Sequence, residues 1–328
     1  MKGLESHPEW DIIDCSKLQD YQECPRKFFY SHILGYSWES PNIHLEFGTA
    51  WHMAMEHLLN NGYSERSVFE AYELFYNYYR DIFSEADDVI NSPKIPKNAE
   101  RALRQYAEYY ANDFDPINGF KVLYTEIASK VEIAEIKEMY FKIDSIVSDP
   151  NIGIHCLEHK TTSSLGSAWA NQWKHKMQVG MYTHVLYCLY EPADVYGVMI
   201  NGVRVTNAPR IKKNGTPYES DRDTEFMRVP VHFTPLQMQV WQDSTEYWYD
   251  SLKRDMDILS SSTDSEEVLK AFRPNGMACS SFSGCPYSTI CAAYANPLRH
   301  LDTIPGGMCV KFWDPTVDLK TAKFVPSL

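Results

Sequence analysis

The chain has 328 residues and a formal net charge of −13, and 44% of its residues are hydrophobic. This composition is typical of a globular protein that can bury a sizeable core in one large domain or two small ones. The sequence contains no apolar run close to the roughly 20 residues of a membrane span, and its first residues lack the apolar part of an export signal. We therefore expect a soluble, cytoplasmic protein. The acidic charge argues against one that coats nucleic acid by general attraction.

The first third of the chain is predicted to be helical. Residues 14–36 favour a helix that begins near Ser16, a suitable N-cap, and that Pro25 interrupts. Residues 46–60 have helical periodicity. The aromatic-rich residues that follow keep this period, and we interpret them as a helical insert at about 60–118.

The period then changes to that of strands. Strand-like segments occur at residues 122–133, 139–147, 154–162, 195–205 and 227–233. Helical patterns at 167–190 and 235–260 separate or follow them. This order predicts an α/β fold with a central mixed sheet of about five strands flanked by helices. The sequence has no G-x-x-x-x-G-K-[ST] motif, so the chain carries no P-loop ATP motor of its own.

Three charged residues on two neighbouring predicted strands point to a hydrolytic site. Glu158 and Lys160 are two apart on one strand, so their side chains share a face. The turn at 148–153 lays the strand of Asp144 beside theirs. Two carboxylates and water suit Mg²⁺, and a nearby lysine can position the attacking water and offset phosphate charge. The alternative is an ordinary amphipathic hairpin with exposed charges.

Three further motifs accompany this pattern. KLQDYQECPRKFFYSHILG lies near the N-terminus, FGTAWHMAMEHLL follows it, and MQVGMYTHVL comes after the Glu-x-Lys strand. Together, in this order, they resemble the PD-(D/E)XK nuclease superfamily, in particular the branch that contains RecB-type nuclease domains, AddB and the CRISPR-adaptation nucleases. The resemblance runs from residue 16 to residue 291. It implies a restriction-endonuclease-like core and metal-dependent cleavage of DNA.

The resemblance also implies roles for individual residues. His52 of the Gly-x-x-x-His motif would be a metal ligand. Gln178 and Tyr182, which share a helix face, would lie beside the active site. Glu126 stands where the family often has another acidic metal-binding residue. The side chain of His159 falls on the strand face opposite Glu158, but its backbone carbonyl would ligate the metal, as the family often uses that position.

The cysteines suggest a second metal centre. Cys279, Cys285 and Cys291 fall at even gaps near the C-terminus, a spacing that indicates a metal or cluster rather than disulfides. The resemblance adds Cys24 and implies a [4Fe–4S] cluster, although the family commonly has C-x2-C where five residues follow Cys279 here. Four thiolates can also hold structural Zn²⁺, and buried reduced cysteines are a further alternative. A link from residue 24 to residue 279 would stabilise the fold by on the order of 5 kcal/mol.

We interpret residues 1–295 as a single nuclease domain, with the cluster segment at 279–291 and a C-terminal tail at 296–328. The predicted activity is that of a Mg²⁺- or Mn²⁺-dependent deoxyribonuclease, an exonuclease that acts on duplex ends or single-stranded DNA. A separate helicase or recombinase is an expected partner, in recombination, repair or phage replication. The alternatives are a CRISPR-adaptation nuclease, a site-specific endonuclease and a non-catalytic iron–sulfur DNA-binding subunit.

Overall fold

The computed structural model describes residues 4–135, 137–216, 223–280, 284–320 and 323–324. Its contacts divide the chain into two compact units, whereas the sequence was interpreted as a single domain over 1–295. Unit 1 consists of Met1–Ser40, Ser129–Phe141 and Pro235–Lys320. Unit 2 consists of Pro41–Ala128, Lys142–Thr234 and Thr321–Leu328.

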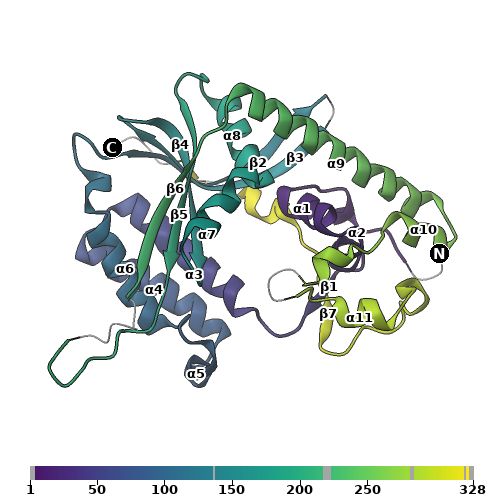
Figure 1. Cartoon of the computed structure of the whole chain (residues 1–328), viewed down its shortest axis with the longest axis horizontal. Coiled ribbons are helices and arrows are strands. Elements are labelled where there is room, and N and C mark those ends of the chain that lie inside the picture. The colour runs from purple at the N-terminus through teal and green to yellow at the C-terminus, as the bar shows by residue number, and fades with distance from the viewer. Residues whose placement is uncertain (1–3, 136, 217–222, 281–283, 321–322, 325–328) are drawn as a thin grey trace. The chain divides into compact units, whose positions relative to one another are not determined.

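A mixed sheet of six strands contains the five strands that the sequence predicts (Figure 1). Its order is β6-β5-β4-β3-β2-β8. β4 pairs with β5 in parallel, and β3–β4, β5–β6 and β2–β8 are antiparallel pairs. The bounds are β2 Lys121–Ala134, β3 Lys137–Asp149, β4 Gly153–Thr162, β5 Val195–Arg204, β6 Glu225–Val231 and β8 Lys323–Phe324. The predicted α/β fold is confirmed, and the tail, which showed no regular pattern in the sequence, adds β8.

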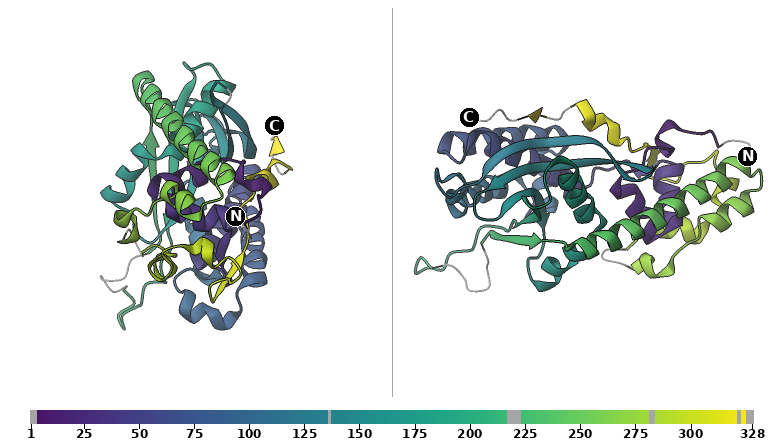
Figure 2. Two further views of the ribbon diagram at one scale, coloured as in Figure 1. Left: turned by 90° about the vertical axis from the view of Figure 1, so that its right-hand side faces the viewer. Right: turned by 90° about the horizontal axis from the view of Figure 1, so that it is seen from above.

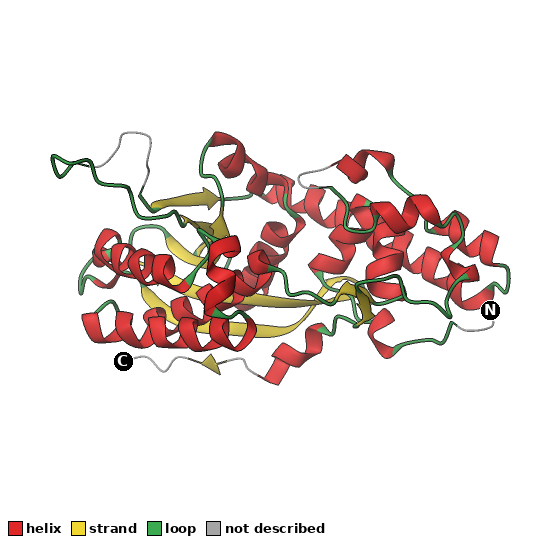
Figure 3. Ribbon diagram, turned by 90° about the horizontal axis from the view of Figure 1, so that it is seen from below, coloured by secondary structure: helices red, strands yellow, loops and turns green. Residues whose placement is uncertain are grey.

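Helices cover this sheet in unit 2 (Figure 3). They are α3 Ile43–Asn61, α4 Glu65–Ile82, α5 Asp88–Asn91, α6 Pro96–Tyr109, α7 Ser167–Gln172 and α8 Met177–Leu189. Along α4, Val68, Ala71, Phe75 and Tyr79 recur at helical spacing and are buried. This stripe packs α4 against α3 and α6, which is why the helical segment predicted at about 60–118 forms a helical layer of its own.

α3 and α8 lie on opposite faces of β4. Leu59 of α3 shares a buried cluster with Leu157, whereas Gln178 of α8 hydrogen-bonds to Glu158. Neighbouring residues of a strand point to opposite faces. The carboxylate of Glu158 is therefore enclosed between the sheet and α8, and α3 packs on the other side.

Unit 1 is mainly helical. It contains α1 Cys15–Glu23, α2 Pro25–Phe28, α9 Pro235–Ser261, α10 Ser265–Ala271 and α11 Ser288–Ala293, with β1 Tyr36–Trp38 paired to β7 Met308–Val310. Figure 2 shows α9 beside α1. α1 begins at Cys15 rather than near Ser16, because the carboxylate of Asp14 accepts the Lys17 N–H and caps the helix. Among the helices of the described residues, none has both the length and the apolar character needed to cross a membrane.

Candidate active site

β3 and β4 are paired in register over residues 146–149 and 153–156. The two strands separate beyond these residues, where Asp144 and Glu158 lie, and we call this place the fork. Beyond this stretch, side chains of β3 reach the backbone of β4. Ser145 Oγ donates to a carbonyl of β4 at 2.9 Å, and Asp144 Oδ2 accepts the N–H of His159 at 2.8 Å. A backbone hydrogen bond thus holds the buried carboxylate of Asp144 at the fork.

His52 of α3 lies against the same carboxylate. Its Nδ1 is 3.2 Å from Asp144 Oδ1. Burial by itself would raise the pKa of Asp144, but the charge and hydrogen bond of His52 outweigh burial and hold that pKa well below its usual range. Burial conversely lowers the pKa of His52, and Asp144 more than offsets this, so that pKa is raised. Two predicted metal ligands, 92 positions apart in the sequence, are thus in contact.

Glu158 is held by a chain of hydrogen bonds from β4 and α8. Lys160 Nζ donates to Glu158 Oε1 at 2.5 Å, and Gln178 Nε2 donates to the same oxygen at 3.2 Å. Gln178 Nε2 also donates to the hydroxyl of Tyr182 at 2.8 Å. That hydroxyl donates to the backbone carbonyl of Lys142 at 2.5 Å. The structure therefore brings the four predicted residues of this face together.

The second oxygen of Glu158 has no such partner. Oε2 is buried, and no described residue hydrogen-bonds to it. Burial and the charge of Asp144 raise the pKa of Glu158 to about 7, although Lys160 opposes this rise. An unpaired carboxylate oxygen in the interior costs free energy. A cation beside this oxygen would remove that cost.

Glu126 lies near the fork but is paired elsewhere. Its Oε2 is 2.7 Å from Lys142 Nζ, and its backbone has a φ of 50°. This left-handed conformation is unfavourable for a residue with a side chain and occurs often at functional sites. Burial raises the pKa of Glu126, and the charge of Asp144 raises it further. The two carboxylates are thus close enough to repel each other, and the metal-binding role of Glu126 stays a prediction.

A buried polar network contacts the ring of His159 on the face of β4 opposite the carboxylate of Glu158. Arg228 donates twice to Asp113, at 2.6 and 2.5 Å, and its Nε lies 3.5 Å from Asn201 Oδ1. Because a guanidinium group only donates, it turns the oxygen of Asn201 toward itself. Asn201 Nδ2 then donates to Tyr106 at 2.6 Å and to His159 Nδ1 at 2.9 Å. Burial lowers the pKa of His159 to about 3, so the ring is neutral. With this orientation of Asn201, Nδ1 accepts and the hydrogen lies on Nε2, which is buried without a hydrogen-bond partner among the described residues.

This network was not predicted from the sequence. Asn201 lies inside an otherwise apolar strand pattern, where asparagine is disfavoured, and that exception was the available signal. Arg228 and Asp113 are 115 positions apart, so no local pattern pairs them. The ring of His159 faces this network and lies opposite the carboxylate of Glu158, as its strand position predicts.

The residues at the fork suit a divalent cation by their chemistry. Two carboxylates and a backbone carbonyl are hard oxygen donors that suit Mg²⁺ or Mn²⁺, and the imidazole of His52 is a softer donor that Mn²⁺ accepts more readily than Mg²⁺ does. The unpaired Oε2 of Glu158 is an open ligand position. Within the described ranges, however, no group of three or more His, Cys, Asp or Glu side chains is arranged to hold a metal ion. His52 and Lys160 contact the carboxylates instead, so these contacts must shift when a cation binds.

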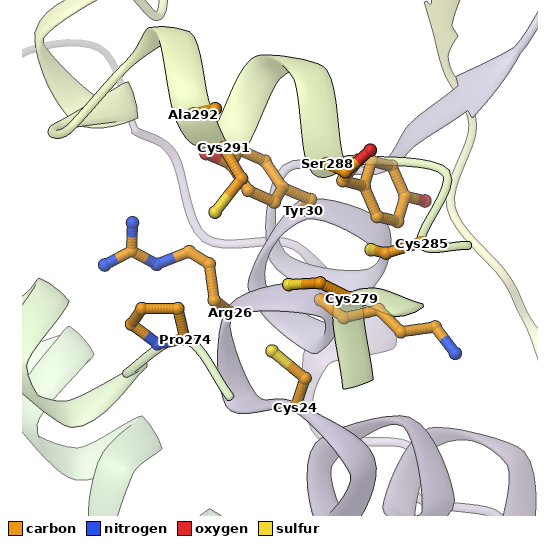
Figure 4. Close-up of a pocket in the computed structure, with 11 residues that line it drawn as sticks. Cys24, Arg26, Tyr30, Pro274, Cys279, Cys285, Ser288, Cys291 and Ala292 are labelled. Carbon is orange, nitrogen blue, oxygen red and sulfur yellow. The ribbon is translucent and has the colours of Figure 1, made fainter. Parts of the chain in front are cut away.

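The four predicted cluster cysteines line one pocket in unit 1. It has a volume of about 230 Å³, and Arg26, Lys27 and Tyr30 also line it. Figure 4 shows the sulfur atoms of Cys24, Cys279, Cys285 and Cys291 turned toward this pocket. Cys24 caps the end of α1, Cys291 lies in α11, and the other two precede α11 in the chain. The chain therefore brings the N-terminal cysteine and the three C-terminal cysteines together.

A backbone N–H and the Arg26 guanidinium favour charged sulfur in this pocket, whereas burial favours the neutral thiols. The backbone N–H of Asn275 donates to Cys24 Sγ at 3.2 Å. Burial raises the pKa of Cys291, the Arg26 guanidinium opposes this rise, and the neighbouring thiols add to it. Burial likewise raises the pKa of Cys285. The thiols thus interact electrostatically, and a metal would relieve their mutual repulsion.

Comparisons with known proteins agree with this geometry. A solved structure titled "Crystal structure of SSO0001" is 14% identical over 85% of this chain and 95% of its own, with a TM-score of 0.27, which is too low to support an inference. No curated protein matches the chain. The family model of the PD-(D/E)XK nuclease superfamily matches residues 14–292, which include all the fork residues and the four cysteines. This match implies a metal-dependent nuclease and a DNA substrate. The chain belongs to the PD-(D/E)XK nuclease superfamily.

Proposed function

We propose that this chain is a Mg²⁺- or Mn²⁺-dependent exonuclease that acts on duplex ends or single-stranded DNA. The observation that carries the proposal is the fork between β3 and β4. There, Asp144 is held by the backbone, and Glu158 keeps one buried oxygen unpaired. Superfamily membership supports hydrolysis of a phosphodiester, and the fork supplies the acidic ligands that this reaction needs.

Each residue at the fork has a proposed role. Asp144, Glu158, His52 and the backbone carbonyl of His159 would hold the cation, with Glu126 as a further acidic ligand. Once bound, the cation would polarise the phosphate and activate a water molecule. Gln178 and Tyr182 orient the carboxylate of Glu158 through their hydrogen bonds.

Lys160 is proposed to stabilise charge rather than to accept a proton. Burial lowers its pKa, but the carboxylates of Glu158 and Asp144 outweigh burial and raise it. The ammonium group therefore stays protonated at neutral pH. It can donate to the attacking water or to a phosphate oxygen, where its charge offsets that of the phosphate.

The exonuclease proposal is tested by a time course on DNA labelled at one end. Linear single-stranded, linear duplex and covalently closed duplex DNA are incubated with Mg²⁺, with Mn²⁺ or with chelator. We expect shortening of the linear substrates only, and only with metal. Glu158→Ala and Lys160→Ala should abolish it, with Lys121→Ala, an exposed lysine at the start of β2, as a matched control. Cleavage of the closed circle would show that the enzyme is an endonuclease. Unchanged activity of Glu158→Ala would reject the fork as the active site.

Because the sequence contains no P-loop motor, we propose that the enzyme acts on loose ends or with a separate helicase or recombinase, in recombination, repair or phage replication. All eight cysteines are unpaired, which supports a reducing compartment such as the cytoplasm. Addition of a candidate helicase to the cleavage reaction tests the partnership. Processive degradation of long duplex DNA only in the presence of the helicase would support it.

We also propose that Cys24, Cys279, Cys285 and Cys291 bind a [4Fe–4S] cluster, as the family resemblance implies, with Zn²⁺ as the alternative. The pocket that the four cysteines share, and the N–H donor to Cys24, support this proposal. A cluster would join segments from both ends of the sequence and so stabilise unit 1.

Metal analysis and visible absorption of protein purified without oxygen distinguish the possibilities. A cubane cluster predicts brown protein with about four irons per chain. Cys24→Ser and Cys291→Ser should lose both colour and thermal stability, whereas the exposed Cys188→Ser should keep them. Colourless protein with one zinc per chain would reject iron–sulfur, and full colour in Cys24→Ser would reject the assignment of this ligand.

A further inference from the structure

A lysine in the helical layer of unit 2 is buried without an anionic partner. Lys94 lies between α5 and α6 and is only 9% exposed. Its Nζ lies 5.6 Å from the centroid of the Phe47 ring, and no hydrogen bond or ion pair joins it to a residue within the described ranges. Burial lowers the pKa of Lys94 to about 8. The stem of Lys94 is buried while its ammonium group reaches the surface, so the group is poorly hydrated and would be stabilised by an external anion.

The backbone, not the charged side chain, holds this residue in place. The carbonyl of Lys94 accepts from the hydroxyl of Tyr79 at 2.9 Å, and its N–H donates to Asn91 at 2.9 Å. The neighbouring carbonyl of Pro93 accepts from the side chain of Asn98. An uncharged side chain of similar length would be held equally well. The position of the backbone therefore does not depend on the ammonium group, which faces the Phe47 ring.

The ammonium faces the beginning of α3, next to a histidine. Phe47 and His44 are three residues apart and share a helix face. Lys94 Nζ lies over the Phe47 ring and therefore within about one helical turn of His44. Burial lowers the pKa of His44, and the charge of Lys94 lowers it further. The nearby carboxylate of Glu46 already accepts from Tyr78 at 2.7 Å. Lys94 and His44 thus form a pair of donors that suits a compact anion.

This pair is aligned with the active site along α3. His44, Gly48 and His52 are spaced by four residues, so they form one stripe of the helix. His44 and His52 are about 12 Å apart along the helix axis, from eight residues at 1.5 Å each. Between them, Gly48 has no side chain, and a Cβ there would meet only Thr161 Oγ1, at 4.0 Å. Gly48 thus leaves the stripe without a side chain between the two histidines.

We propose that Lys94 and His44 form a subsite for an internucleotide phosphate of the DNA strand, a few nucleotides from the scissile phosphate. This inference rests on the proposed function, because the repeated phosphates of a nucleic acid place an anion at a fixed spacing from the one being cleaved. Lysine is a good partner for such a phosphate, since its three donors rotate freely. The subsite would fix the register of the strand, while the fork carries out the chemistry.

The test is a scan with single-stranded oligonucleotides in which one phosphate at a time is replaced by a neutral methylphosphonate. Wild-type protein should lose affinity about tenfold at one position near the cleavage site. Lys94→Met should bind the unmodified strand about tenfold more weakly and should show no further loss at that position, because the contact is already gone. The slope of log affinity against log salt should fall by about 0.7. Lys97→Met, on the exposed side of α6, is the matched control and should retain the wild-type scan.

Hydrolysis of a small phosphodiester distinguishes a defect in this subsite from a defect in the active site. Hydrolysis of bis(4-nitrophenyl) phosphate should be the same in Lys94→Met and wild type, because this substrate does not reach Lys94. Equal sensitivity of both proteins at every methylphosphonate position would overturn the subsite. A wild-type protein that binds strands with this scan but hydrolyses neither substrate would reject the proposed function and leave the subsite standing. Lys94→Arg should keep the wild-type scan, and Lys94→Gln replaces Lys94→Met if that variant does not fold.

Discussion

Replacing Glu158 by glutamine should inactivate the enzyme and, without metal, make it more stable at alkaline pH. Glu158 is 1% exposed, and its Oε2 has no hydrogen-bond partner among the described residues. Burial and the charge of Asp144 raise its pKa to about 7. Glutamine has the same shape and keeps an acceptor for Lys160, but it has no charge to desolvate. Glu158→Gln therefore removes a cost that only a bound cation would otherwise remove.

The magnitude follows from the linkage between protonation and folding. In the unfolded chain the carboxyl loses its proton near its ordinary pKa of about 4.3. The folded protein keeps that proton up to about pH 7. Between these values the unfolded state binds fewer protons, so the stability of the wild type falls by about 1.4 kcal/mol per pH unit and then levels off. Glutamine does not titrate. Its advantage should therefore grow by about 2 kcal/mol between about pH 5.5 and pH 8.5.

The assay is thermal or urea denaturation in chelator at several pH values, followed by the same measurement with Mn²⁺. Metal at about 100 times its dissociation constant should stabilise the wild type by about 2.7 kcal/mol and Glu158→Gln hardly at all. Metal affinity of the wild type should also rise with pH up to about 7, because the cation displaces the proton of Glu158. Glu158→Asn, which leaves a gap as well, is a control for volume. If the stability difference between Glu158→Gln and wild type does not depend on pH, Glu158 is not a buried carboxyl group that ionises near pH 7.

Three further changes test neighbouring residues. Asn201→Asp should lower the turnover rate more than it changes KM. A carboxylate at this position accepts a hydrogen bond from His159 Nδ1, so the ring hydrogen moves away from Nε2. The ¹⁵N chemical shifts of histidine report the tautomer, and an unchanged Nε2–H would contradict the network. Gly48→Ala should raise the free energy of unfolding by about 0.5–1 kcal/mol in thermal denaturation, since glycine weakens a helix interior and the added Cβ has room. Destabilisation would show that the Cβ does not fit. His52→Ala should lower activity most at low metal concentration and be partly rescued by Mn²⁺, and a metal titration like that of wild type would remove His52 from the ligands.

Most elements of the fold could be predicted from local patterns. The alternation of residues 122–133 and 139–147 and the helical period of 46–60 each depend on neighbours within a few positions, and β2, β3 and α3 form at these places. The start of α1 was less accurate, because Asp14 and Ser16 are both good N-caps and the choice depends on which side chain reaches a free N–H. The division into two units and the pairing of β8 involve contacts between distant segments, which no local pattern specifies.

At the active site, the sequence by itself determined that Glu158 and Lys160 share a face, because residues two apart on a strand always do. The motifs also indicated His52 as a candidate ligand. Only the tertiary structure decided that His52 contacts Asp144, that a fork leaves one oxygen of Glu158 unpaired, and that Lys94 is buried beside α3. These facts depend on desolvation and on charges brought together from distant positions, and both exist only once the chain has folded.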